Sequence, residues 1–278
     1  MGVVLATLLP ACCVFNGAKH PAEKQTLPET LERETVALDR WLGVVGEDEE
    51  GEEVIGDVDP EKDAKAELRA YCTGVWVSKD TILTAEHCVD DLGRPEEDPR
   101  RAMIRELLGM PKDRWDPTGQ PLWISAFGEV SEGAKKLRGS HRATVLAVDW
   151  EHDLALVKVN KEEMATVAAH PVATLAREGS LHVGDDVHIV GHTVGMWWSY
   201  TRGWVAQVRP GMDGPDGDKK YDCVQVSAPV WFGNSGGGAF NANGELIGIS
   251  SFIRKVPNMS FFVDTEHLRT FLAHNVTR

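Results

Sequence analysis

Short apolar segments recur from Tyr71 to the end of this 278-residue chain, and turn sequences such as Asn243-Gly244 separate many of them. The segments occupy residues 73–78, 81–85, 143–148, 154–159, 186–191, 203–208, 223–227, 245–252 and 260–264. Apolar runs of this length with polar turns between them are typical of β-strands joined by hairpins. Because almost no helical pattern intervenes, the sequence predicts an all-β sandwich or barrels and argues against a parallel sheet with crossover helices.

Two helical patterns and two polar stretches complete the organisation. Residues 100–110 have helical spacing inside a polar insertion at about 90–120, and residues 264–275 predict a C-terminal helix. Residues 16–40 are polar and favour a tether with at most a short helix. Residues 47–63 hold ten carboxylates and one lysine without the spacing of a calcium loop, a composition typical of a solvated loop.

The N-terminus is apolar up to Phe15, which is shorter than the about 20 residues that span a bilayer. Such a run is typical of the apolar core of a signal peptide. Leu9 to Cys12 resemble a bacterial lipobox, in which the cysteine is lipidated. We therefore expect an extracytoplasmic protein, periplasmic, lipid-anchored or secreted, with Cys12 as the candidate membrane tether. A frayed apolar terminus is the alternative interpretation.

Charge and histidine spacing argue against two classes of ligand. The formal net charge of −14 disfavours nucleic acid, because binding to phosphates requires clustered lysine and arginine. His182, His188 and His192 have a spacing that would suit a metal, but no cysteine or carboxylate pattern completes a ligand set. We expect no metal, no other cofactor and no nucleic-acid partner.

Residues 231–240 crowd glycines around Ser235. The residues suit a plain turn. They also suit a nucleophile, because small neighbours let a carbonyl group approach Ser235 Oγ and expose backbone N–H groups to the developing oxyanion. A serine hydroxyl is a poor nucleophile near neutral pH, so this second interpretation requires a general base and a group that orients the base.

His87 is the candidate base. It follows a predicted strand and precedes Cys88, while Cys72 begins the preceding strand. Two strands and a turn between the cysteines would bring their ends together, so we expect a disulfide that restrains the histidine loop. The remaining cysteines include Cys223, whose pairing the sequence leaves open.

Asp153 is the candidate orienting carboxylate, since it directly precedes a fully apolar strand where it would be largely buried. Asp149 and Glu151 are nearby alternatives, and a capping turn is the non-catalytic interpretation of Asp153. The order His87, Asp153, Ser235 is that of chymotrypsin. Residues 233–237 also match G-x-S-x-G, the nucleophile elbow of α/β-hydrolases. In those enzymes the acid and the histidine follow the serine, which here would be Asp264 with His267 or His274. The elbow also requires a helix after the serine, where this sequence predicts strands.

These segments resemble the trypsin-like, chymotrypsin-fold serine proteases. That family's three signature regions are similar to LTAEHC, DLALVKV and GNSGG in this chain. The segments from His182 onward resemble the protease domains of bacterial HtrA/DegP-like proteins, and we expect a protease domain without the PDZ domains of those proteins. The resemblance implies two six-stranded antiparallel β-barrels with a C-terminal helix. We therefore divide the chain into a signal-like segment at 1–17, a tether and acidic segment at 18–65 with room for a first barrel strand, and a protease domain at 66–278.

The resemblance also implies residue roles. His87, Asp153 and Ser235 would form the catalytic triad, the segment Gly233, Asn234 and Ser235 the oxyanion hole, and Ser251 would donate a hydrogen bond to Asp153. Protein or peptide substrates are expected, and a protease-fold binding module without activity is the alternative.

Three departures from the family pattern qualify those roles. Glu86 replaces an alanine beside the base. Asn234 replaces the aspartate that receives a freed amino terminus, so we expect no trypsin-style activation by cleavage. Pro229 stands where trypsins carry their specificity aspartate, which predicts small or medium apolar side chains at the substrate position P1. The expected pocket residues are Pro229, Val230, Phe232, Phe252 and Ile253.

Overall fold

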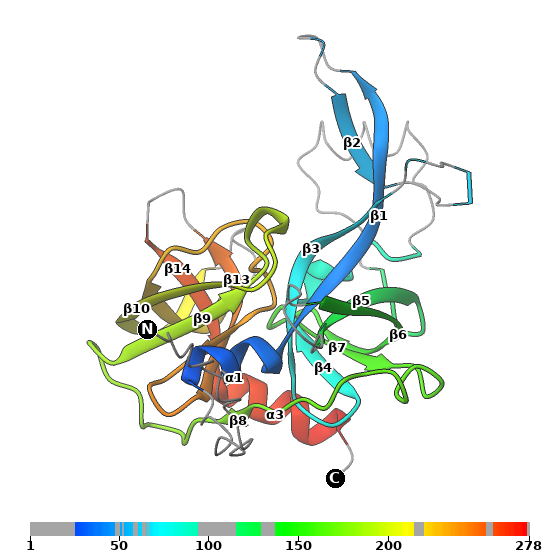
Figure 1. Cartoon of the computed structure of the whole chain (residues 1–278). Helices are drawn as coiled ribbons and strands as arrows, with labels where there is room; N and C mark the ends of the chain where they lie inside the picture. Colours follow the sequence, from blue (N-terminus) through cyan, green and yellow to red (C-terminus); the bar gives the residue numbers. More distant parts are fainter. Residues whose placement is uncertain are drawn as a thin grey trace, which may run out of the picture.

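The computed structural model describes residues 26–47, 51, 53–57, 61–62, 65, 67–93, 115–128, 137–213, 220–253 and 258–276. Two closed barrels lie side by side (Figure 1), and every pairing that closes them is antiparallel. The predicted double barrel of six strands each is confirmed. The predicted helix at 100–110, Cys12 and part of the acidic run lie outside the described residues. Within the described ranges, no helix has the length and apolar character needed to cross a membrane.

The first barrel has the strand order β1, β3, β4, β7, β6, β5 and closes where β5 pairs with β1. Its strands are β1 (Thr35–Glu47), β3 (Glu67–Trp76), β4 (Thr81–Thr84), β5 (Pro121–Gly128), β6 (Leu137–Asp149) and β7 (Leu154–Val159). A further strand, β2 (Glu53–Asp57), pairs with the outer part of β1, and this hairpin projects away from both barrels (Figure 1). Residues 35–40, which the sequence places in the tether, are thus the start of a barrel strand.

The second barrel has the order β12, β9, β10, β11, β14, β13 and closes where β12 pairs with β13. Its strands are β9 (Asp186–Gly191), β10 (Ser199–Asp213), β11 (Lys220–Ser227), β12 (Gly238–Phe240), β13 (Glu245–Ile253) and β14 (Ser260–Asp264). The short strand β8 (Thr174–Leu175) adds to β13 in parallel. Since β12 follows Ser235 as a strand, the helix that a hydrolase elbow requires is absent there.

Alternating burial along β7 explains its fully apolar sequence. Ala155 and Val157 point into the core of the first barrel, whereas Leu154 and Leu156 pack in a second cluster with residues of the other barrel. Successive side chains of a strand face opposite sides. A strand that lies between a barrel core and an inter-barrel core therefore needs apolar residues on both faces.

Two helices cover the inter-barrel cluster. Helix α1 (Leu27–Glu34) begins with a capping box of Thr26 and Glu29, and its Leu31 is fully buried there. Helix α3 (Thr265–Asn275) confirms the predicted C-terminal helix, and its Leu268 joins the same cluster. The two helices thus hold the barrels in the arrangement that places the site.

Candidate active site

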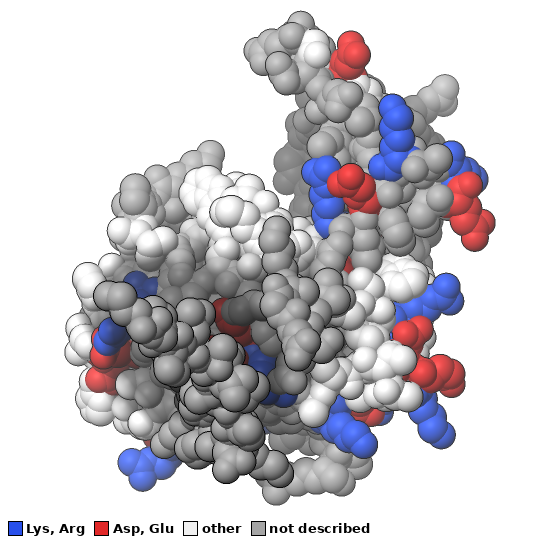
Figure 2. Space-filling view, in the orientation of Figure 1, with Lys and Arg blue, Asp and Glu red and all other residues white. Residues whose placement is uncertain are grey.

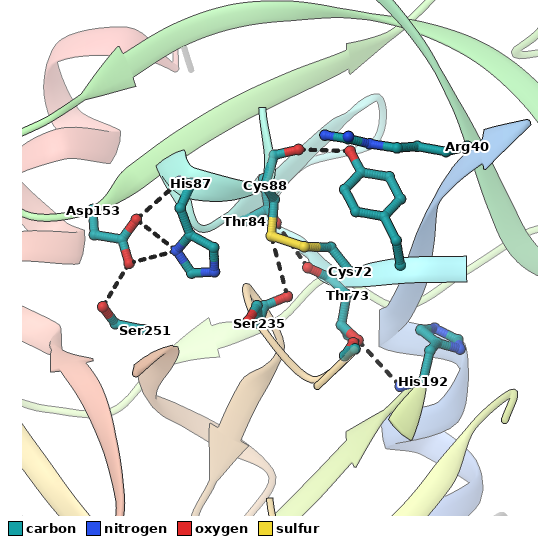
Figure 3. Close-up of a disulfide and its surroundings, with 12 residues drawn as sticks. Arg40, Cys72, Thr73, Thr84, His87, Cys88, Asp153, His192, Ser235 and Ser251 are labelled. Carbon is teal, nitrogen blue, oxygen red and sulfur yellow. Dashed lines mark hydrogen bonds and ion pairs between the residues drawn. A yellow bond between two sulfur atoms is a disulfide. The ribbon is translucent and has the colours of Figure 1, made fainter. Parts of the chain in front are cut away.

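The three candidate catalytic residues come from three separated elements. His87 lies on the 3₁₀ helix η1 (Glu86–Cys88) that follows β4, and Asp153 lies in the turn before β7. Ser235 lies in the loop between β11 and β12 of the second barrel. Figure 3 shows the His87 ring between Asp153 and the loop of Ser235. The structure therefore brings both barrels to one site.

Asp153 fixes the orientation of the His87 ring. Both carboxylate oxygens of Asp153 lie 3.0 Å from His87 Nδ1, and Oδ1 also accepts the His87 backbone N–H at 3.0 Å. Ser251 Oγ donates to Asp153 Oδ2 at 2.5 Å. Asp153 is buried and adopts a left-handed backbone, φ 55°. With Nδ1 donating to a carboxylate, Nε2 of the neutral ring is free to accept a proton.

Opposing effects set the pKa of His87. Desolvation of the ring favours the neutral form, but the charge and hydrogen bond of Asp153 favour the imidazolium, as do the nearby Glu86 and Asp90 carboxylates. The net result is a pKa above the usual value of 6.5. Glu86, the departure noted in the sequence, therefore makes the candidate base more basic.

The alternative carboxylates are engaged elsewhere. Asp149 accepts the backbone N–H groups of Glu151 at 3.0 Å and His152 at 3.2 Å, and its Oδ2 lies 2.8 Å from His152 Nδ1. Glu151 itself is exposed. Asp264 caps the N-terminus of α3. Among the carboxylates weighed from the sequence, Asp153 is the one beside the His87 ring.

Steric limits explain the glycines around Ser235. Gly233 and Gly236 have φ values of 94° and 79°, a conformation that residues with a Cβ rarely adopt. A Cβ at Gly233 would collide with the His192 carbonyl oxygen, and one at Gly236 with Thr84 Oγ1. The Ser235 side chain is half-buried. No hydrogen bond joins its hydroxyl to the His87 ring in the described structure.

The loop also presents unused backbone donors. The Phe232 carbonyl accepts the Val194 N–H at 2.8 Å, which turns the N–H of the same peptide unit, that of Gly233, to the opposite side. Within the described residues, the Gly233 and Ser235 N–H groups donate to no other group. Asn234 instead faces inward and is buried. Two such N–H groups beside a serine hydroxyl are donors of the kind that an oxyanion hole uses.

Buried Asn234 supports the loop from within. Its side-chain nitrogen donates to Thr193 Oγ1 at 2.8 Å and to the Trp231 carbonyl at 3.2 Å. Both partners lie in segments that connect strands of the second barrel. These contacts support the expectation that a freed amino terminus is not needed at this position.

The predicted disulfide is present between Cys72 and Cys88, with their Cα atoms 6.1 Å apart. Two contacts that were not predicted from the sequence reinforce it. Tyr71 donates from its hydroxyl to the Cys88 carbonyl at 2.6 Å, and the Arg40 guanidinium lies 4.2 Å from the Tyr71 ring centre. Arg40 also pairs with Asp91, after the histidine loop. Local sequence carries no signal for this arrangement, because Arg40 and Asp91 meet only through barrel closure.

The expected pocket residues differ in exposure. Phe232 is 68% exposed beside the loop, and Pro229 is also exposed. Phe252 stacks on Phe261 at 4.7 Å in a buried cluster with the free Cys223. Val230 and Ile253 are half-buried.

The three spaced histidines face different partners. His182 lies 3.8 Å from Asp185, His188 lies 2.7 Å from the Tyr200 hydroxyl, and His192 is fully buried. They therefore do not form one ligand set. In the described part of the chain, three potential ligand side chains converge at Cys72, His87 and Cys88, where the disulfide occupies both sulfur atoms.

Known proteins resemble this chain in sequence and in fold. The model of the trypsin-like peptidase domain matches residues 72–249. Human serine protease HTRA4 is 32% identical over 152 residues, which cover 54% of this chain and 29% of HTRA4. Serine protease HTRA1A of Danio rerio is 30% identical over 151 residues, again 54% of this chain and 29% of that protein. The matched region thus spans less than a third of these curated relatives.

Solved structures share the fold. The HtrA-type protease AlgW with decapeptide superposes with a TM-score of 0.58 at 19% identity, covering 90% of this chain and 66% of that chain. Deg5 gives a TM-score of 0.54 at 18% identity, covering 88% of this chain and 89% of that one. The chain therefore belongs to the trypsin-like peptidase family, and its peptidase domain is similar to those of HtrA-type proteases.

Proposed function

We propose that this chain is a serine endopeptidase that cleaves peptide bonds through an acyl-enzyme, with His87, Asp153 and Ser235 as its triad. The observation that carries the proposal is the Asp153 carboxylate on His87 Nδ1, at 3.0 Å, with the loop of Ser235 across the ring (Figure 3). Such a carboxylate leaves Nε2 as the ring's proton acceptor.

The proposal assigns a residue to each chemical step. Nε2 of His87 takes the Ser235 hydroxyl proton while Oγ attacks the substrate carbonyl carbon. The substrate carbonyl oxygen becomes negative and accepts hydrogen bonds from the N–H groups of Gly233 and Ser235. The C–N bond then breaks as His87 returns the proton to the leaving amine. A water molecule then attacks the acyl-enzyme carbonyl carbon while His87 takes one of its protons. The bond from that carbon to Ser235 Oγ breaks, His87 returns the proton to Oγ, and the acid product leaves.

The Asp153 carboxylate stabilises the imidazolium that forms at His87. Ser251 keeps the second carboxylate oxygen of Asp153 satisfied. Catalytic hydrogen bonds commonly tighten when substrate binds. Rotation about the side-chain bond of Ser235 is the motion that we expect to complete the contact with His87.

The substrates proposed are proteins or peptides with a small or medium apolar P1 residue, such as Ala or Val. Pro229 supplies no carboxylate at the specificity position, so a P1 arginine or lysine would be buried without a counter-charge. On the face shown in Figure 2, the described Lys and Arg side chains lie among Asp and Glu side chains. Cleavage profiling of a peptide library tests this preference, and a dominant Arg, Lys or Glu at P1 would contradict it.

Labelling with a fluorophosphonate probe tests the nucleophile. We expect wild type to be labelled and Ser235→Ala to lose labelling, with a fall in kcat of about 10⁶. Ser180→Ala is the matched control, because Ser180 is half-buried and, among the described residues, its hydroxyl donates to the nearby Arg177 carbonyl. An unlabelled wild type that still binds unfolded protein would favour the alternative function, a protease-fold binding module.

We also propose that the chain acts outside the cytoplasm and is tethered to a membrane through lipidated Cys12. The Cys72–Cys88 disulfide supports the first part, since disulfides persist in oxidising compartments. Incorporation of labelled palmitate into the full chain in bacteria, compared with Cys12→Ala, tests the second. Equal labelling of both proteins, or of neither, would refute lipidation at this residue.

A further inference from the structure

Thr73 connects the first barrel to the loop of Ser235. It is fully buried on β3, one residue after the disulfide cysteine Cys72. Its backbone N–H donates to the Ser235 carbonyl at 2.8 Å. Its hydroxyl donates to the Gly233 carbonyl at 2.6 Å and accepts the His192 N–H at 3.2 Å. Figure 3 shows the Thr73 side chain directed toward His192, from the same strand as Cys72.

The hydroxyl joins two segments that together set one peptide orientation. The Gly233 carbonyl is held by Thr73, and the preceding carbonyl, that of Phe232, is held by the Val194 N–H at 2.8 Å. Val194 lies two residues after His192, and the His192 N–H donates to the Thr73 hydroxyl. The peptide planes on both sides of the Gly233 Cα atom are therefore fixed, and with them the direction of the Gly233 N–H.

We propose that Thr73 is a positioning residue for the oxyanion hole, acting through its hydroxyl on the Gly233 peptide. This role rests on the proposed endopeptidase function. Without the hydroxyl, the Gly233 carbonyl and the His192 N–H lose the hydrogen-bond partner that they share. The peptide unit that carries the Gly233 N–H can then rotate away from the site at a lower cost in free energy. A donor that points away cannot stabilise the oxyanion.

Packing alone is the competing explanation for Thr73. A Cβ added at Gly237 would lie 3.0 Å from Thr73 Cγ2, so the methyl group sits closely against the serine loop. The methyl and the hydroxyl of Thr73 face different parts of that loop. Substitutions that remove one and keep the other therefore separate the two roles.

The experiment compares two matched pairs in the full chain. Thr73→Val keeps the shape and removes the hydroxyl, relative to wild type. Thr73→Ala and Thr73→Ser both lack the methyl group and differ in the hydroxyl. Each variant is checked by far-UV circular dichroism and then assayed for hydrolysis of β-casein and for inhibition by a peptide aldehyde, whose adduct on Ser235 places an oxygen in the oxyanion hole.

We expect Thr73→Val and Thr73→Ala to lower kcat at least about tenfold with little change in KM, part of the about 10²–10³ that loss of one donor costs. Aldehyde affinity should fall in parallel, and Thr73→Ser should restore both. If Thr73→Val does not fold, the comparison of Ala with Ser decides the question.

Two results would overturn this role while leaving the proposed function intact. One is a Thr73→Ala variant as active as Thr73→Ser, and the other is a loss confined to KM with unchanged aldehyde affinity. Failure of the wild type to show Ser235-dependent hydrolysis would instead refute the endopeptidase function, and the role of Thr73 with it.

Discussion

Removal of the Cys72–Cys88 disulfide should lower the free energy of unfolding by an amount that follows from the number of residues between the two cysteines. The bond joins residues 16 positions apart and ties the His87 helix η1 to β3. In the chain-entropy description, a crosslink over a loop of this size contributes about 3 kcal/mol. For a domain of this size, that corresponds to a fall in Tm of about 6–12 °C.

The variant is Cys72→Ala/Cys88→Ala, since both positions are buried and alanine introduces no polar group. The histidine loop keeps the hydrogen bond from the Tyr71 hydroxyl to the Cys88 carbonyl. We therefore expect the folded double variant to retain measurable hydrolysis. The main loss should be in thermal stability.

Thermal unfolding followed by circular dichroism measures the effect. Cys223→Ala is the matched control, because it removes a buried sulfur atom without a crosslink. A reducing agent should lower the Tm of wild type toward that of the double variant and leave the double variant unchanged. A double variant that melts together with Cys223→Ala would refute the reasoning.

Three further predictions follow from the charged groups. Asp153→Asn should lower kcat by about 10⁴, because the ring of His87 would then hold the wrong tautomer; near wild-type kcat would remove Asp153 from the triad. Since the pKa of His87 is raised, kcat/KM should fall as the pH drops through a midpoint above 6.5, and Glu86→Gln should move that midpoint to lower pH; an unmoved midpoint would contradict the role of Glu86. Burial raises the pKa of Glu34 from 4.5 to about 7, so the folded state binds the carboxyl proton of Glu34 more tightly than the unfolded state does. The free energy of unfolding should therefore decrease as the pH rises from 4.5 to about 7. In urea titrations at pH 8, Glu34→Gln should be more stable than wild type by on the order of 3 kcal/mol, and a stability gap of equal size at pH 4 would argue against ionisation as its cause.

Local patterns in the chain were enough to locate most of the strands after residue 70, the C-terminal helix and the disulfide. Apolar alternation and turn residues act over a few positions, so they are readable without the fold. Strand β5 carries no such pattern and was not predicted, and β1 was foreseen only as room for a first barrel strand within residues 18–65. In β1, a buried Asp39 interrupts the apolar run, and its Oδ2 accepts a hydrogen bond from Ser125 Oγ of β5 at 2.5 Å. A polar residue of this kind becomes compatible with a barrel only when its distant partner is known.

Candidate residues for the site were also readable from motifs, but their mutual arrangement was not. The sequence left Asp149, Glu151 and Asp153 as alternatives, and the tertiary structure places Asp153 on the His87 ring. It also places Thr73 on Gly233, 160 positions away. Contacts at such separations arise because two barrels close and pack together, and no local propensity encodes them. Residue chemistry was therefore set by local sequence, whereas orientation and hydrogen-bond partners were decided by the packing of the barrels.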